Sequence, residues 1–181
     1  MYADNTLTPK EAIRLCALGT LANGPLRYAA LANATRHFVG HILGPSLDLM
    51  GTSVELLKYE GLIEAVDGKG MADDAELRIT EAGRAALDAL LTARLRSGAA
   101  ELNKLIMALK FRFLHLLKDG DRLAQADHLI EVCENELARL DALRQYHGED
   151  PGFLVAWLDH DIGQAETRLA WLKDFRAALK A

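Results

Sequence analysis

The chain has few residues of the kinds that mark several protein classes. Of its 181 residues only 6% are aromatic, 4 are proline and 2 are cysteine. The two cysteines, Cys16 and Cys133, have no metal-type spacing and lie within apolar patterns, which argues against a disulfide framework. We therefore expect reduced thiols that fill core positions as small hydrophobic side chains.

Long apolar runs are also missing. The longest uncharged stretches run from Leu15 to Leu26 and from His37 to Leu47, well short of the roughly 20 apolar residues that cross a bilayer. The first residues, Met1–Asn5, lack the basic segment and apolar core of a signal peptide. We expect a cytoplasmic protein that makes no use of a membrane.

The chain also lacks an excess of positive charge. The chain has 21 basic and 26 acidic side chains, a formal net charge of −5. Residues 1–98 carry 10 basic and 12 acidic side chains, and residues 99–181 carry 11 and 14. Because a nucleic-acid-binding protein is usually basic overall, any DNA-binding surface here must be a local one.

Helix signals come first along the chain. Thr8 and Glu11 form a capping box with Pro9 at the first helical position, and Asn23-Gly24-Pro25 ends a helix of about 14 residues. A second helix is expected over Arg27 to Phe38, with a break from Gly40 to Pro45. A third begins at Ser46 and runs to Glu60-Gly61.

The pattern then changes from helical to alternating. Leu62–Val66 and Glu76–Thr80 flank the turn residues Asp67–Gly70, which predicts a β-hairpin. Thr80 can cap a further helix towards Arg96. The resulting order of three helices, a hairpin and a helix predicts a winged helix-turn-helix domain over residues 1–96.

Residues 97–181 are expected to form a helical dimerisation domain. Apolar residues recur there in steps of three and four along three segments, separated by Asp119-Gly120-Asp121 and by Glu149–Gly152. This narrow apolar seam is typical of helices that pack against another helix. The residues that we assign to dimerisation are Leu105, Leu109, Leu169, Trp171 and Leu172.

Segments along most of the chain resemble the PadR family of transcriptional regulators, and within it the AphA-like branch. The matching segments are Leu7-Thr8-Pro9, Asn23-Gly24-Pro25-Leu26, Val54–Ile63, Leu77–Gly83 and Glu166–Leu172. The resemblance implies a homodimer joined through its C-terminal helices that presents winged helices to duplex DNA. It further implies that a small phenolic or drug-like ligand, or a protein partner, controls some members.

The sequence departs from this family at several positions. The family often has a tyrosine where Gly51 stands and an aromatic residue where Leu43 stands. The expected recognition helix has no basic residue before Lys58, and the wing has only Lys69 at its tip, followed by Asp73 and Asp74. Fewer phosphate contacts weaken binding to every DNA sequence, so the alternative is a winged-helix protein-interaction module that has lost DNA binding.

Seven residues are candidates for contact with DNA. Short hydroxyls can bind bases or phosphates, although Ser46 can also serve only as the helix cap. Basic side chains on a winged helix can bind phosphates. The candidates are the hydroxyl residues Ser46, Thr52 and Ser53 and the basic residues Arg27, Arg36, Lys58 and Lys69.

For the candidate metal-binding and ligand-binding residues, a structural role is favoured. His37 and His41 have a spacing that metal sites use, but no further ligand lies nearby in sequence, so we expect a solvent-facing or structural role. No nucleophile is placed with an oriented base, so we expect no enzyme, metal or cofactor. Trp157 and Trp171 could line a site for a small aromatic effector, but helix packing or a dimer contact is favoured.

Overall fold

The computed structural model describes residues 6–44, 51–66, 74–96 and 99–179, with side chains from Val54 onward in the second range. The chain divides into two compact units, Met1–Leu117 and Lys118–Ala181.

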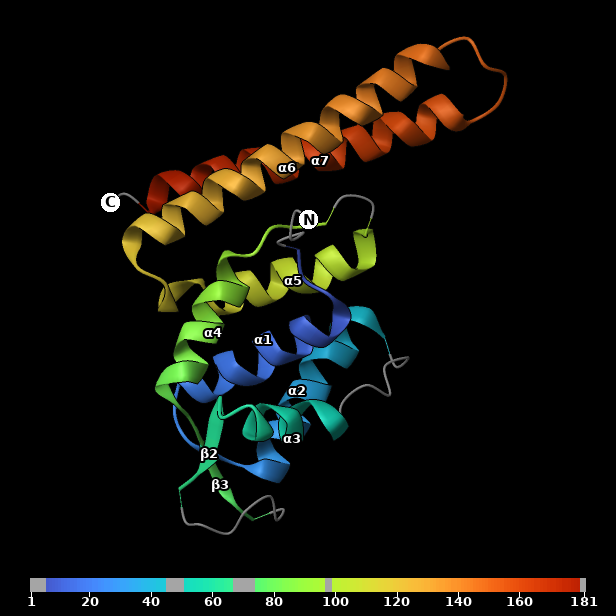
Figure 1. Cartoon of the computed structure of the whole chain (residues 1–181). Helices are drawn as coiled ribbons and strands as arrows, with labels where there is room; N and C mark the ends of the chain where they lie inside the picture. The colour runs from blue at the N-terminus through green and yellow to red at the C-terminus, as the bar shows by residue number, and fades with distance from the viewer. Residues whose placement is uncertain (1–5, 45–50, 67–73, 97–98, 180–181) are drawn as a thin grey trace, which may run out of the picture. The chain divides into compact units, whose positions relative to one another are not determined.

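In the first unit a buried helix, α1 (Pro9–Ala22), is the element around which the others pack. It begins with the predicted capping box between Thr8 and Glu11, and it has the predicted 14 residues. It contacts α2, α3, α4, α5 and the strand β3, and Figure 1 shows α1 among the helices of this unit. Its buried residues, Ala12, Ile13 and the run Leu15 to Leu21, form the centre of the core.

The second helix is longer than predicted. Helix α2 spans Tyr28–Leu43, so the predicted break at Gly40 is wrong. A single glycine inside a helix costs only about 1 kcal/mol, and α2 buries Leu31 and Val39 on either side of the expected end. The helix ends instead at Gly44, whose positive φ of 85° suits glycine.

The predicted hairpin is confirmed and has a third strand beside it. Strands β2 (Ile63–Ala65) and β3 (Glu76–Ile79) pair antiparallel, and β1 (Leu26–Arg27) pairs with the other edge of β3, giving the order β1-β3-β2. The sequence did not predict β1 because two residues show no alternation. The predicted wing tip, including Lys69, lies outside the described residues.

Helices α3, α4 and α5 complete the first unit. Helix α3 is Gly51–Tyr59, and the expected start at Ser46 lies outside the described residues. Helix α4 (Glu81–Thr92) is capped by Thr80 as predicted but stops short of Arg96. Helix α5 (Ala100–Phe113), followed by the short 3-10 helix η1 (Leu114–Leu116), contacts α1 and α2. The compact unit therefore includes α5, while the functional division at residues 96 and 97 stays a prediction.

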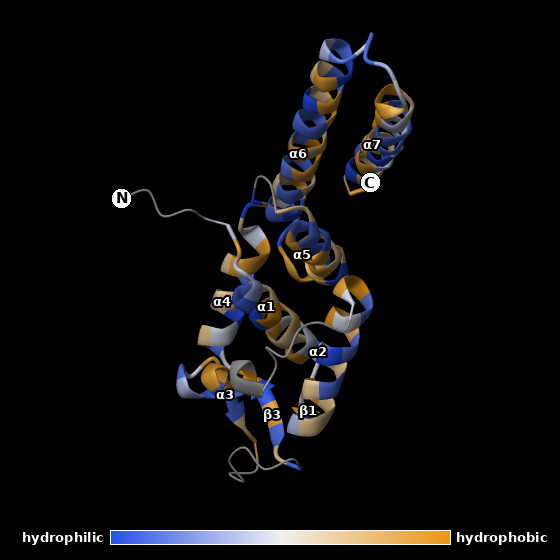
Figure 2. Ribbon diagram, turned by 90° about the vertical axis from the view of Figure 1, so that its right-hand side faces the viewer, coloured by the Kyte–Doolittle hydropathy of each residue, from blue (hydrophilic) through white to orange (hydrophobic). Residues whose placement is uncertain are grey.

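The second unit is an antiparallel helical hairpin. It consists of α6 (Asp119–Tyr146) and α7 (Leu154–Ala178), joined by the predicted turn with Gly152 at φ 113°. Asp119 and Asp121 lie in the first turn of α6, where negative charge is favourable. Both helices mix hydrophilic and hydrophobic residues along their length (Figure 2).

The net charge is divided unequally between the two units. Residues 1–117 carry 13 basic and 13 acidic side chains, and residues 118–181 carry 8 and 13. The first unit is thus formally neutral, and the hairpin carries the whole net charge of −5. Across the described part of the chain, no helix is both long enough and apolar enough to span a membrane.

Candidate nucleic-acid interface

Helix α3 has one buried face and one exposed face. Val54 and Leu57 are 2% and 0% exposed, and α3 contacts α1. Leu56 is 50% exposed and Tyr59 is 90% exposed, and Glu55 is exposed beside them. The first unit thus holds this helix firmly by its apolar side and leaves the opposite side free for a partner.

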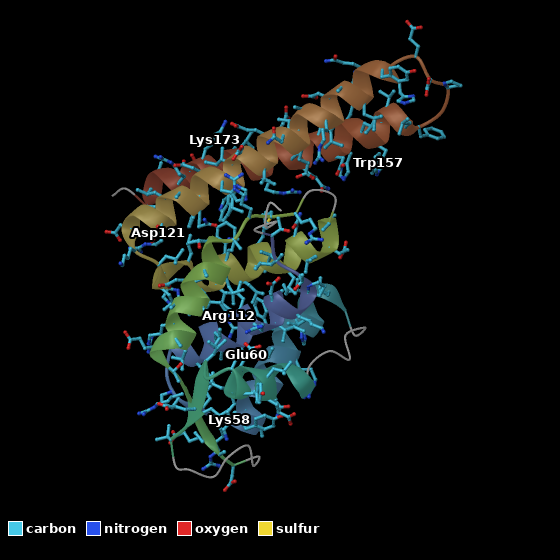
Figure 3. All side chains as sticks on the ribbon, viewed as in Figure 1. Lys58, Glu60, Arg112, Asp121, Trp157 and Lys173 are labelled. Carbon is cyan, nitrogen blue, oxygen red and sulfur yellow. The ribbon has the colours of Figure 1, made fainter. Side chains whose placement is uncertain are left out.

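The end of α3 is fixed by local backbone geometry and by an ion pair. Gly61 has a φ of 72°, a left-handed conformation that lets the amide of Leu62 donate to the carbonyl of Leu57 at 2.8 Å. The Arg14 guanidinium of α1 forms an ion pair with the Glu60 carboxylate directly after the helix. Lys58 lies in the last turn, where positive charge is favourable; Lys58 and Glu60 are labelled in Figure 3.

Thr80 joins the end of α3 to the start of α4. Its hydroxyl donates to the Gly61 carbonyl at 2.8 Å and accepts from the Gly83 amide at 3.0 Å. Its own amide donates to the Leu62 carbonyl at 3.1 Å. A Cβ at Gly83 would overlap the Leu62 carbonyl oxygen and lie 2.7 Å from Ile79 Cγ1. The segment Leu77–Gly83 therefore needs both its threonine and its glycine to position α3.

One basic side chain of the wing, Arg78, is paired with an acidic side chain of the same sheet. Arg78 and Glu64 are cross-strand partners in β3 and β2, and Arg78 Nε donates to Glu64 Oε1 at 2.6 Å. This pair neutralises both charges. Neither Arg78 nor Glu64 therefore adds net charge to this surface.

The predicted phosphate-binding residues lie on several elements of the first unit. Arg27 is exposed in β1, in register with Glu76, and directly precedes α2. Arg36 is exposed on α2, where its Nη1 donates to Asn33 Oδ1 at 3.0 Å. Lys58 is half-buried on α3. Ser46 and Lys69 lie outside the described residues, as do the side chains of Thr52 and Ser53. All seven DNA contacts stay predictions.

The exposed side chains of α3 were not among the sequence candidates. The signal was present in the buried pair: Val54 and Leu57 are three residues apart, so the opposite side of the helix must carry Glu55, Leu56 and Tyr59. Hydroxyl and basic side chains are the usual DNA contacts, so a leucine, a tyrosine and a glutamate were not predicted.

The two histidines lie on the surface of α2 near its end. His37 and His41 are exposed and their rings stack with centroids 4.1 Å apart. His41 Nδ1 lies 2.7 Å from the His37 carbonyl oxygen. Within the described ranges, no three His, Cys, Asp or Glu side chains come together as a metal site.

Both cysteines are buried free thiols, as predicted for core positions. Burial raises the pKa of Cys16 to about 11, against a smaller lowering by the Arg112 charge. Burial likewise raises the pKa of Cys133. Arg112 Nη1 lies 3.8 Å from Cys16 Sγ, and its guanidinium carbon lies 4.6 Å from the centre of the Phe38 ring.

The residues assigned to dimerisation fall into two groups. Leu105 and Leu109 of α5 are 1% and 0% exposed within a single chain. In α7, Leu172 is buried, Leu169 is half-buried and Trp171 is 52% exposed. Trp171 stacks on Phe175 with ring centres 5.6 Å apart. A contact between chains can thus use Leu169 and Trp171 without unfolding the chain, while the interface role of all five residues stays a prediction.

Ion pairs fix the register of the hairpin. Four basic side chains bind acidic partners on the other helix: Arg144 with Asp159, Arg168 with Glu136, Lys173 with Glu134 and Arg176 with Asp127. The hydrogen bond from Arg144 lowers the pKa of Asp159. Trp157 is 58% exposed and lies towards the opposite end of α7 from Lys173 (Figure 3).

Comparison with known proteins agrees with this geometry. The family described as "Putative AphA-like transcriptional regulator" matches residues 2–176. The chain belongs to this AphA-like transcriptional regulator family, and its fold is the mostly helical winged-helix fold with a small three-stranded antiparallel sheet. The family is one of transcriptional regulators by its description.

Two solved structures match the chain over most of its length. Bacillus subtilis PadR in complex with p-coumaric acid is 15% identical, with 97% of this chain and 99% of that chain covered and a TM-score of 0.39. A second structure of Bacillus subtilis PadR is 13% identical, with the same coverage and TM-score. A search of curated protein sequences returns no match.

Proposed function

We propose that the protein is a sequence-specific DNA-binding transcriptional regulator that acts as a homodimer. The observation that carries the proposal is the exposed face of α3. This helix is held through Val54 and Leu57 on α1, braced at its end by Thr80, and open to solvent on its other side. A helix presented in this way suits the major groove, into which an α-helix fits.

Phosphate contacts would come from the neighbouring elements. Arg27 and Arg36 are exposed on β1 and α2, and Lys58 lies in the last turn of α3. Together with Lys69, which the sequence assigns to the wing, they are the cations that we propose for phosphate contacts. The acidic excess does not oppose this role directly, because it resides in residues 118–181 and the first unit is formally neutral.

The hairpin supports the homodimeric part of the proposal. Each helix of a two-helix hairpin can cover only part of the apolar seam of the other. Several of the apolar residues that recur along α6 and α7 remain half-buried in the single chain: Ile130, Leu137, Leu140, Ile162 and Leu169. Pairing with the same surface of a second chain would cover them and would set the spacing of two DNA half-sites.

The first experiment is selection of duplexes from a random library by the full chain. We expect enrichment of an inverted repeat that is bound with strong salt dependence. R27A and R36A should each weaken binding to all duplexes and reduce the salt slope. R139A is the matched control, because it removes one exposed arginine from α6. Equal binding by all four proteins would contradict the phosphate roles.

One observation favours the alternative of a protein-interaction module without DNA binding. Glu55 lies exposed beside Leu56 and Tyr59 on α3, and a carboxylate repels phosphates. Under this alternative the library yields no enriched duplex even at low salt. The same selection therefore separates the two functions.

Control by a small aromatic effector is the last part of the proposal. Trp157 and Trp171 are both more than half exposed on α7, and aromatic side chains commonly line small-molecule sites. p-Coumaric acid, which one similar structure holds, is the first probe. We expect it to raise the melting temperature and to weaken binding of the selected duplex. An unchanged melting temperature and duplex affinity at millimolar probe would exclude this effector.

A further inference from the structure

The chemistry of the exposed face of α3 is unusual for a recognition helix. Within the part of α3 whose side chains are described, the exposed residues are Glu55, Leu56 and Tyr59. Tyr59 follows Glu55 and Leu56 by four and three residues, so the three share one side of the helix. The only cation of this part, Lys58, is half-buried.

Each base pair offers a different set of groups in the major groove. Guanine is read most often by arginine or lysine, thymine offers a methyl group to apolar side chains, and the amino group of cytosine donates to a carboxylate. The described face of α3 has no arginine. It has instead one apolar side chain and one carboxylate, which are the partners of thymine and cytosine.

The two acidic residues near the end of α3 are in different situations. Glu60 is paired with Arg14 of α1. Glu55, among the residues that the structure describes, has no ion pair or hydrogen bond of its side chain. Its carboxylate therefore keeps its acceptor capacity for a partner outside the chain. In a groove lined by phosphates such a charge is unfavourable unless a base donor faces it.

Glu55 and Leu56 are close enough along the helix to contact neighbouring bases. Glu55 and Leu56 are consecutive, so they lie about 1.5 Å apart along the axis and about 100° apart around it. Tyr59 is one turn further on, at the last residue of the helix, and its hydroxyl can reach a phosphate. The helix cannot rotate to present other residues, because Val54 and Leu57 are buried beneath it.

We infer that this face reads pyrimidines: Leu56 contacts the methyl group of a thymine, and Glu55 accepts a hydrogen bond from the amino group of a cytosine. Tyr59 binds the backbone beside them. The inference rests on the proposed DNA-binding function and adds the bases that it selects. The partner is thus a duplex with a thymine and a cytosine near each other in each half-site.

The test uses the duplex selected by the full chain, with each thymine replaced in turn by uracil. Uracil lacks only the methyl group, so replacement of the contacted thymine in one half-site should weaken wild-type binding about fourfold. L56A should bind the thymine duplex more weakly and show no response to uracil. L143A is the matched control, since Leu143 is 42% exposed on α6, and it should keep the full uracil response.

The carboxylate is tested with E55Q and with duplexes changed at each cytosine. If Glu55 reads cytosine, E55Q binds less selectively, and replacement of that cytosine weakens the wild type at least fivefold more than the variant. If Glu55 only repels phosphates, E55Q binds every duplex more tightly and its base preference is unchanged. That second result overturns the role of Glu55.

The outcomes also separate this inference from the proposed function. If no duplex is enriched, both are wrong. If a duplex is enriched but uracil replacement and L56A act independently of each other, DNA binding stands and the role of Leu56 is wrong. Circular dichroism of L56A and E55Q should match the wild type, because both side chains are exposed.

Discussion

The guanidinium of Arg14, on the central helix α1, forms an ion pair with the carboxylate of Glu60 directly after α3. Both side chains are about one third exposed, so the pair contributes little to stability, of the order of 1 kcal/mol or less. Its larger consequence concerns charge. Without Arg14, a second unpaired carboxylate would stand beside the end of the recognition helix, where DNA phosphates are expected.

We therefore predict that R14M weakens DNA binding several-fold at low salt and that R14M/E60Q restores it. E60Q alone should not weaken binding. Fluorescence anisotropy with the selected duplex at two salt concentrations measures these effects, and urea unfolding shows that stability changes little. A loss in R14M that persists in the double variant would mean that Arg14 itself binds DNA.

Gly83 is predicted to be essential for the join between α3 and α4. In G83A the new methyl would overlap the Leu62 carbonyl oxygen and crowd Ile79, so we expect destabilisation by about 3 kcal/mol. G163A is the control, because nothing lies within 4 Å of a Cβ at Gly163 of α7. It should stabilise the helix by up to about 1 kcal/mol. Equal melting temperatures for the two variants would contradict the close packing at Gly83.

Lys110 is predicted to make stability increase in mildly alkaline solution. It is fully buried on α5, and its ammonium donates to the carbonyls of Leu91 and Ala93. Burial lowers its pKa to about 8 from the ordinary 10.5. Between these values the folded chain has released a proton that the unfolded chain still holds, so the free energy of unfolding rises with pH.

The measurement is urea unfolding of the wild type and of K110M at pH 7 and pH 9.5. The difference between the two proteins cancels the titration of other groups. The wild type should gain about 2 kcal/mol relative to K110M over this range. No relative gain would mean that Lys110 titrates as an exposed lysine does.

Both thiols are predicted to be inert in the folded protein. Burial raises the pKa values of Cys16 and Cys133, and a thiol reacts through its thiolate. Ellman's reagent at pH 8 should therefore label neither residue within minutes, and should label both in guanidinium chloride. Rapid labelling of the native protein would show that one of the helices opens readily.

Local signals in the sequence predicted much of the fold. The capping box at Thr8, the alternation around Leu77 and the cap at Thr80 each depend on residues close together in sequence, and each is confirmed. The predicted end of α2 was wrong because burial of Leu31 and Val39 outweighs the helix-breaking tendency of Gly40. Such burial depends on tertiary contacts that no local pattern reports.

The candidate site was less accessible to prediction. Whether Arg78 is available for phosphates depends on its pairing with Glu64, and the charge of Glu60 depends on Arg14, 46 residues earlier. The division after Leu117 places α5 with the first unit and all the net charge in the hairpin. Composition reports neither which charges are paired nor where the unit boundary lies. The net charge of the whole chain therefore argued against DNA binding, although residues 1–117 are formally neutral.

In the function that we propose, two chains bind one specific duplex through their α3 helices. Sedimentation equilibrium of the full chain with the selected inverted-repeat duplex at moderate salt tests it most directly. We expect a complex of two chains and one duplex, with only weak salt-sensitive association on a scrambled duplex. A complex of one chain per duplex, or equal binding of both duplexes, would contradict it.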